Sequence, residues 1–160
     1  MSGRRLLVSL IVVLGLGVPA SAEDAEQKVP ADTPGTVQVS CDFIEITASS
    51  GKAVAVDPAL KPLEKRLTKV FDKKWNDFKQ LSRASSTLAK KKPEVLKLKQ
   101  GTATATLVEI VDKSKVRLTV EFDDGKGKAN QTQLVDAGDW VITVIQQPSG
   151  DGHLLAGSCK

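Results

Sequence analysis

Residues 115–122, Lys-Val-Arg-Leu-Thr-Val-Glu-Phe, decide the fold class of this chain. Apolar side chains alternate strictly with polar ones here, at Val116, Leu118, Val120 and Phe122. In an extended strand, a period of two places the apolar residues on one face and the polar residues on the other. The stretch therefore predicts a β-strand with one buried face and one face in water.

Further strand patterns flank this stretch on both sides and are separated by short turns. They cover residues 37–46, 75–81, 95–99, 102–111, 129–135, a segment that begins at Trp140, and 154–159. The parity of the apolar residues changes after Phe43, which predicts either burial on both faces or a bulge there. Residues 82–94 predict a loop. Consecutive strands joined by short turns favour an antiparallel sheet.

One amphipathic helix interrupts the strand patterns. Asp57 is a good N-cap and Pro58 suits the first helical position, and we expect the helix to end near Lys73 or Lys74. At about 100° per residue, one face carries Leu60, Leu63, Leu67, Val70 and Phe71. The other side carries Lys61, Lys65, Arg66, Lys69 and Lys73. The expected fold class is α+β: a mostly antiparallel β-sheet with one amphipathic helix packed on it.

The helix segment carries a resemblance to other proteins. The pattern Asp57-Pro58-x-Leu60-x-x-Leu63-x-x-x-Leu67-x-x-x-Phe71, followed by Phe78 and Leu81, resembles the leading segment of a group of small exported bacterial proteins of unknown function. In that group an early strand, an amphipathic helix that opens with Asp-Pro, and a run of strands recur in this order. The group has no known catalytic residues, so the resemblance implies an α+β architecture and no mechanism.

Residues 1–22 predict a signal peptide. Arg4 and Arg5 precede an apolar run, residues 6–18, and the small residues up to Ala22 suit cleavage after that position. The run is shorter than the about 20 residues that span a bilayer as a helix. We therefore expect export to the periplasm or the outside of the cell, and no transmembrane segment in the mature chain.

The mature chain divides into two parts. Residues 23–36 are polar, contain two prolines and predict a flexible lead-in. Residues 37–160 predict a single β-rich domain. This domain contains both cysteines, Cys41 and Cys159. Because an exported chain meets an oxidising environment, we expect these two residues to form a disulfide that joins the first strand to the last.

Three groups of residues have the chemistry of catalytic or metal sites. Ser149, Asp151 and His153 are the residue types of a hydrolase triad, but they lie in one Gly-rich turn, whereas a triad converges from distant segments. His153 would also join Cys41 and Cys159 around zinc, without the paired spacing of structural zinc sites. The acidic pairs flank glycines and predict turns rather than acid–base or calcium sites: Asp123/Asp124 and Asp136/Asp139. We expect no catalytic residue, metal or cofactor.

Charge is concentrated in the middle of the chain. Residues 61–99 contain 13 Lys or Arg and four acids, net +9, whereas residues 23–160 together carry only +2. A solvated surface accounts for this block, and so would an anionic partner. The candidate anion-binding residues are Lys61, Lys65, Arg66, Lys69, Lys73, Lys90, Lys91 and Lys92.

The expected function follows from these observations. We expect a non-catalytic exported domain that acts as a binding or accessory module of the cell envelope. The alternative is an electrostatic binder of anionic lipid or polysaccharide through residues 61–99, and a small hydrolase ranks last. Nucleic acid is not an expected partner, because the chain is exported and has few aromatic residues for base stacking.

Overall fold

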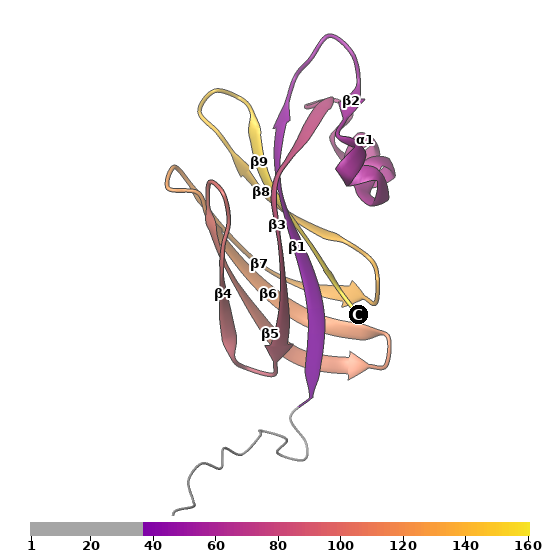
Figure 1. Cartoon of the computed structure of the whole chain (residues 1–160), viewed down its shortest axis with the longest axis vertical. Helices are drawn as coiled ribbons and strands as arrows, with labels where there is room; N and C mark the ends of the chain where they lie inside the picture. Colours follow the sequence, from indigo (N-terminus) through magenta and orange to yellow (C-terminus); the bar gives the residue numbers. More distant parts are fainter. Residues whose placement is uncertain (1–36) are drawn as a thin grey trace, which may run out of the picture. The chain divides into compact units, whose positions relative to one another are not determined.

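Nine strands and one helical segment make up residues 37–160, the part of the chain that the computed structural model describes (Figure 1). The predicted signal peptide and lead-in, residues 1–22 and 23–36, lie outside the described residues. The strands are β1 (Gln38–Ser49), β2 (Ala55–Val56), β3 (Asp77–Ala89), β4 (Pro93–Lys97), β5 (Thr102–Asp112), β6 (Lys115–Asp123), β7 (Lys128–Asp136), β8 (Val141–Gln146) and β9 (Gly152–Cys159). The helical segment is a 3₁₀ helix, Pro58–Leu63, that continues into α1, Glu64–Phe71.

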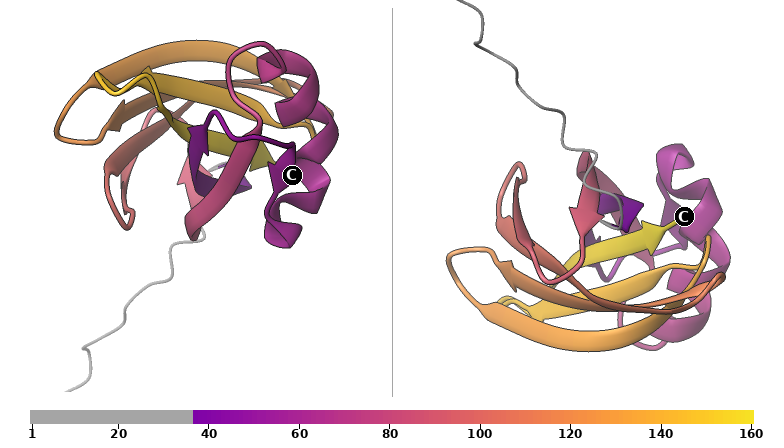
Figure 2. Two further views of the ribbon diagram at one scale, coloured as in Figure 1. Left: turned by 90° about the horizontal axis from the view of Figure 1, so that it is seen from above. Right: turned by 90° about the horizontal axis from the view of Figure 1, so that it is seen from below.

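The strands form two sheets rather than one. The first has the order β2-β3-β1-β9-β8 and the second the order β4-β5-β6-β7. All pairings are antiparallel except the short parallel pairing of β2 with β3. The expected α+β class with mostly antiparallel strands is confirmed. Views along the domain show the two sheets as facing layers, with the helix outside the first sheet (Figure 2).

The chain crosses between the sheets twice, and both crossings lie at the same end of the sandwich. They are the segments 90–92, between β3 and β4, and 137–140, between β7 and β8. The pairing registers place both beside the start of β1 and the end of β9. We call this the crossover end. The opposite end, with the turns 98–101, 124–127 and 147–151, has no chain connection between the sheets within residues 37–160, and we call it the free end.

Two apolar cores hold these layers together. One lies between the sheets and includes Phe43, Leu118 and Phe122. The other lies between the first sheet and the helix and includes Leu63 and Leu67, each 0 % exposed as the sequence predicts. Because β1 and β9 have a core on either side, β9 is buried at all eight positions.

The helix begins as predicted but departs from the expected stripe. The carboxylate of Asp57 accepts a hydrogen bond from the backbone N–H of Ala59 at 2.9 Å, as an N-cap does. The first turns are 3₁₀, because Pro62 has no N–H and its ring crowds the preceding α-turn. Val70, predicted on the apolar face, is 59 % exposed. It lies about 60° around the helix from Leu67, beyond the contact with the sheet.

The predicted loop 82–94 is wrong over most of its length. Residues 82–89 continue β3, which pairs with β1 from Asp77 to Ala89. The segment consists largely of Ser, Ala and Thr, and only Leu88 is fully buried, so its apolar alternation is weak. Backbone pairing with the central strand β1 stabilises the strand despite this composition.

The parity change in the first strand reflects burial on both faces, which is the first of the two predicted alternatives. Phe43, Ile44, Glu45 and Ile46 are all buried, so both faces of β1 are covered. A bulge lies slightly further on, where Glu45 pairs with Ser82 but Ile46 pairs with Gln80. The extra residue is therefore Leu81 of β3.

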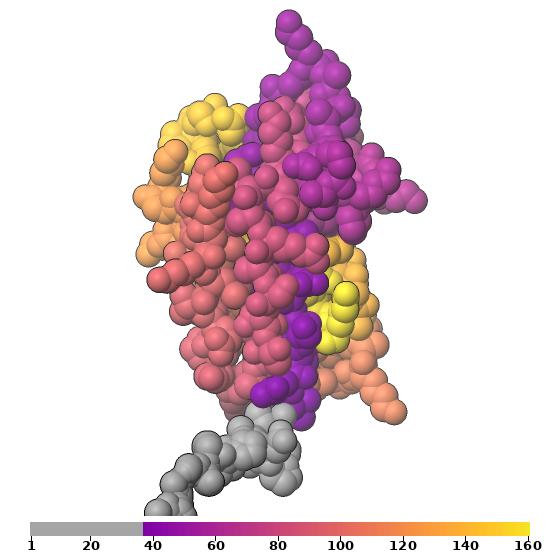
Figure 3. Space-filling view, viewed as in Figure 1, coloured from indigo at the N-terminus to yellow at the C-terminus, as the bar shows by residue number. Residues whose placement is uncertain are grey.

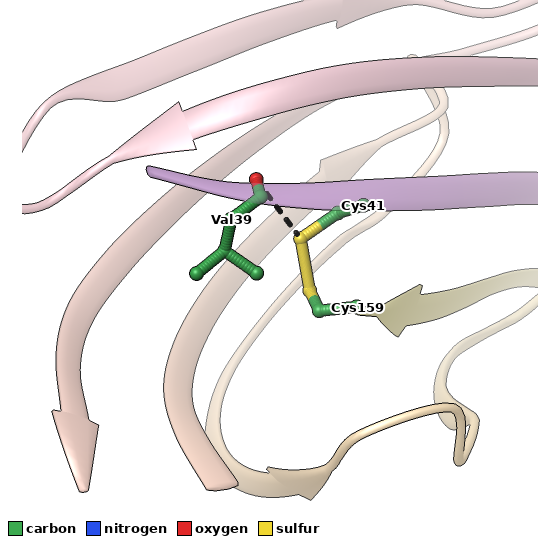
Figure 4. Close-up of a disulfide and its surroundings, with 3 residues drawn as sticks. All are labelled: Val39, Cys41 and Cys159. Carbon is green, nitrogen blue, oxygen red and sulfur yellow. Dashed lines mark hydrogen bonds between the residues drawn. A yellow bond between two sulfur atoms is a disulfide. The ribbon is translucent and has the colours of Figure 1, made fainter. Parts of the chain in front are cut away.

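The predicted disulfide is confirmed. Cys41 and Cys159 are directly paired residues of β1 and β9, with Cα atoms 4.1 Å apart and sulfurs bonded at 2.08 Å (Figure 4). The carbonyl oxygen of Val39 lies 4.0 Å from the sulfur of Cys41. The bond joins the first strand of the domain to its last, and is consistent with an oxidising compartment.

Candidate functional site

The main polar feature of the domain is a buried row of three charged side chains at the free end. His153 of β9 lies between Glu45 of β1 and Asp124, which follows β6. Its Nε2 is 2.9 Å from Oε1 of Glu45, and its Nδ1 is 2.9 Å from Oδ2 of Asp124. The side chains of Glu45, Asp124 and His153 are 0 %, 2 % and 5 % exposed. We call these three residues the buried charge row.

Glu45 reaches from the first sheet to the second. Its Oε2 accepts hydrogen bonds from the Ser82 hydroxyl at 2.6 Å and from the backbone N–H of Lys99 at 2.8 Å. Its Oε1 accepts from the backbone N–H of Gln100 at 2.9 Å as well as facing His153. Because Lys99 and Gln100 belong to the β4–β5 turn, this carboxylate ties β1 to the opposite sheet.

Asp124 reaches in the other direction, from the second sheet to the first. Its Oδ1 accepts from the backbone N–H groups of Lys126 and Gly127, and its Oδ2 accepts from Nε2 of Gln147 and faces His153. Burial raises the pKa of the Asp124 carboxyl. The hydrogen bonds from His153, the two backbone N–H groups and Gln147 outweigh burial and hold that pKa below its ordinary value.

Donors from both sheets occupy most of the acceptor positions of the two carboxylates. Each carboxylate accepts three hydrogen bonds from groups other than His153. Each ring nitrogen of His153 faces one carboxylate oxygen. The edge of this ring packs on Phe122, with ring centroids 4.8 Å apart. The row is therefore an imidazole held between two buried carboxyl groups.

A cleft of about 940 Å³ opens above this row. Its walls come from both sheets: residues 47–49, Lys79, 147–149 and 151–153 on one side, and Gln100, Asp124 and Lys126 on the other. The lining is rich in side chains that can form hydrogen bonds: hydroxyls (Thr47, Ser49, Ser149), amides (Gln100, Gln147) and lysines (Lys79, Lys126). We call this the free-end cleft.

One polar atom in the cleft wall has no partner. Nε2 of Gln147 donates to Asp124, which leaves Oε1 of the same amide buried without a hydrogen-bond partner among residues 37–160. A buried acceptor without a donor costs about 1–3 kcal/mol. An incoming donor would remove that cost.

The predicted Ser149–Asp151–His153 group does not come together as a triad. The Ser149 hydroxyl lies 3.1 Å from the Asp151 carboxylate in an exposed turn, as the turn interpretation expects. His153, however, is not a turn residue. It is the second residue of β9, and both its nitrogens face Glu45 and Asp124.

The zinc alternative is excluded for Cys41 and Cys159, because both sulfurs are in the disulfide at the crossover end. Within residues 37–160, no group of three His, Cys, Asp or Glu side chains is arranged to hold a metal ion.

The acidic pairs lie in turns as predicted. The Asp123 carboxylate accepts from the backbone N–H of Gly125 at 2.8 Å, and Asp139 follows Asp136 in the turn after β7. The Arg66 guanidinium holds the pKa of Asp139 below its usual range by hydrogen bonding to it. Asp124 does more than the sequence predicts, since one oxygen caps the turn and the other joins the buried charge row.

The candidate anion-binding lysines fall into two separate groups. Lys61, Lys65 and Lys69 are exposed on the helical segment, and Lys73 is exposed in the turn that follows it (Figure 3). Lys90, Lys91 and Lys92 are also exposed, but they lie at the crossover end. The 13-residue strand β3, about 40 Å long, separates the two groups. The structure therefore places these lysines in two groups at opposite ends of β3 (Figure 1).

Two ion pairs reduce the free charge on the helix. Arg66 pairs with Asp139 at 2.5 Å, and Lys61 pairs with Glu64 at 3.3 Å. Lys65, Lys69 and Lys73 form no ion pair with other described residues.

Glu45 is the site residue that the sequence analysis missed. It lies between Ile44 and Ile46 in an apolar strand, where a charged side chain on the face of a core needs a partner. That position was the only signal in the sequence for a buried charge, and it does not indicate the partner, His153, which is 108 residues away.

Comparisons with known protein families, with curated proteins and with solved structures each found no match. The resemblance to small exported bacterial proteins stays a prediction. Among residues 37–160, no helix has both the length and the apolar character needed to cross a membrane.

Proposed function

We propose that this chain is a non-catalytic binding module of the cell envelope, exported to the periplasm or the outside of the cell, and that its ligand occupies the free-end cleft. The observation that carries the proposal is the unpartnered Oε1 of Gln147, a buried atom of a residue that lines that cleft. A ligand with a hydroxyl or amine donor would satisfy this atom.

The lining favours an acidic sugar as the ligand. Hydroxyl and amide side chains suit a polyhydroxylated molecule, and Lys79 and Lys126 at the exposed rim suit its negative charge. The acids of the same lining are already engaged, because Asp124 accepts four hydrogen bonds and Asp151 faces Ser149. At the rim, Lys79 pairs with Asp77 at 3.6 Å, whereas Lys126 has no ion-pair partner among residues 37–160, so Lys126 is the cation that would meet an anion.

A binding role suits this cleft better than catalysis. His153 is the only histidine of the chain, and both its ring nitrogens are bonded to buried carboxylates. Neither nitrogen is free to take a proton from a nucleophile or from water. The Ser149 hydroxyl contacts Asp151 and not a base of this kind.

Calorimetric titration with trigalacturonic acid and with neutral maltotriose tests the proposal. We expect binding of the acidic sugar only, weakened about tenfold by Lys126→Gln, since a charge-assisted hydrogen bond contributes about 1.5–3 kcal/mol. Lys113→Gln removes the same charge from the turn after β5, at the crossover end, and is the matched control. Absence of binding, or equal weakening by both variants, would refute the cleft as the site.

A second candidate function is favoured by the exposed helix face. Lys65, Lys69 and Lys73 have no acidic partner among the described residues, and Val70 beside them is 59 % exposed. Lysines around an exposed apolar side chain suit the surface of an anionic membrane.

Sedimentation with anionic and neutral vesicles tests this second function. We expect binding to anionic vesicles at low salt and its loss in 1 M salt, where the Debye length is about 3 Å. Replacing Lys65, Lys69 and Lys73 by Gln should abolish binding. The same triple change at Lys90, Lys91 and Lys92 is the control at the opposite end of β3, and an equal effect of both triples would argue against a helix surface.

A further inference from the structure

We propose that the buried charge row is a latch that holds the free end of the sandwich shut, and that the two sheets can part there while they stay joined at the crossover end. The inference deepens the proposed function, because the free-end cleft lies directly above the latch and has walls from both sheets.

The first argument is the distribution of covalent links. The chain passes between the sheets only through segments 90–92 and 137–140 within residues 37–160, and both are at the crossover end. The disulfide between Cys41 and Cys159 is at the same end. Separation of the free end therefore strains no chain connection of the described residues.

The second argument is that the polar contacts of the free end run across the gap between the sheets. Glu45 of the first sheet binds the backbone of Lys99 and Gln100 of the second. Asp124 of the second sheet binds His153 and Gln147 of the first. Each carboxylate thus holds the sheet opposite its own, and His153 connects the two carboxylates. A shift of either sheet breaks bonds at both.

The third argument is that the latch depends on charge. The bonds of Glu45 and Asp124 across the gap all end on carboxylate oxygens, whereas the Lys99 N–H also lies 3.2 Å from the Ser82 hydroxyl and Gln131 of β7 donates to Thr143 of β8. Replacing either carboxylate by its amide turns one of its acceptors into a donor. The other elements around His153 supply no further titratable side chain to the row: Ile145 of β8 and Thr47 of β1 flank it in the sheet, and Phe122 of β6 packs on its ring. Lys79, Lys126 and Asp151 are the charged groups of the cleft above. Because the three side chains form one connected row, a change at one carboxylate should also weaken the contacts of the other.

Amide hydrogen exchange of the ligand-free protein tests the latch. The reporters are the backbone amides of four turn residues, Lys99, Gln100, Lys126 and Gly127. They donate hydrogen bonds to Glu45 or Asp124, and the Lys99 amide also lies 3.2 Å from the Ser82 hydroxyl. In Asp124→Asn we expect the amide hydrogens of all four residues to exchange at least tenfold faster. This includes Lys99 and Gln100, which donate to Glu45 and make no contact with the replaced side chain. Amides of Ala137, Gly138 and Lys160, at the crossover end, should keep their rates.

Asp42→Asn is the matched control. Asp42 also lies in β1 and accepts hydrogen bonds from Ser85 and Arg83, but both partners belong to β3 of the same sheet. This variant should leave all four reporters unchanged.

Three results would overturn the latch. In Asp124→Asn, acceleration limited to Lys126 and Gly127 would mean a local loss of bonds, and equal acceleration at the crossover end would mean general destabilisation.

If Asp124→Asn does not fold, native-state exchange of the wild type in dilute denaturant replaces it. The four reporters should then open together with a smaller denaturant dependence than the crossover-end amides, and opening only with global unfolding would contradict the proposal. Because no sugar is present, failure of the proposed function leaves these results intact.

Discussion

Glu45 illustrates how one residue can serve the fold only through distant partners. Its carboxylate has four hydrogen-bond partners, which belong to β3, the β4–β5 turn and β9. Its own strand, β1, has an apolar core on either face. Such a charge is tolerated in the interior because every lone pair is used. Its neighbours in sequence say nothing about where these donors come from.

Glu45→Gln should therefore be strongly destabilising. The amide keeps the shape but replaces one acceptor by a donor that faces donors, and we expect a loss of about 3–5 kcal/mol in the free energy of unfolding. Glu109→Gln is the control, because Glu109 pairs with Arg117 on the exposed face of the second sheet and should cost less than about 1 kcal/mol. Urea unfolding followed by circular dichroism measures both, and similar midpoints would show that the buried charge row adds no stability.

Asp124 should make stability depend on pH in the acid range. Its folded-state pKa is below the ordinary value, so its contribution is complete above about pH 4 and is lost as pH falls through the lowered pKa. The unfolded state binds the proton first, which is why acid favours unfolding. Asp124→Asn should flatten the decrease in melting temperature between pH 4 and pH 2. A decrease as steep as in the wild type would assign the acid sensitivity to other carboxyls.

At the scale of elements, the helix offers the sharpest contrast between buried and exposed positions. Leu67 is fully buried against the first sheet, and Val70 on the same helix is 59 % exposed. Leu67→Ala should cost about 2–5 kcal/mol through lost contacts and a residual cavity. Val70→Ala and Lys65→Ala should change the unfolding midpoint far less. Equal midpoints for Leu67→Ala and Val70→Ala would contradict the packing of the helix.

Elements with a strong local pattern could be predicted from the sequence. The alternation in β6 and the Asp57-Pro58 start of the helix are local signals, and both match the structure. The second half of β3 could not be predicted, because backbone pairing with β1 stabilises it rather than its own apolar residues. The candidate site also escaped prediction, because Glu45, Asp124 and His153 meet only when two sheets stack. No pattern of spacing along the sequence indicates that these three residues meet.

At the scale of the whole domain, the disulfide closes most of the chain into a ring. Its loop has a sequence separation of 118 residues, and a ring of that size contributes about 5 kcal/mol in the chain-entropy model. We expect reduction, or Cys41→Ala with Cys159→Ala, to lower stability by an amount of this order. The denatured, unreduced protein should show no thiol that reacts with a maleimide reagent. Two reactive thiols per chain would refute the bond.

The position of β9 has a consequence for the order in which the protein can fold during synthesis. β9 follows every other strand in the chain, yet it lies between β1 and β8 and contributes to both cores. A ribosome must therefore complete residues 152–159 before either core can close, and until then the nascent domain has an open sheet. For the same reason, a nascent chain that stalls before Gly152 should be degraded rather than fold.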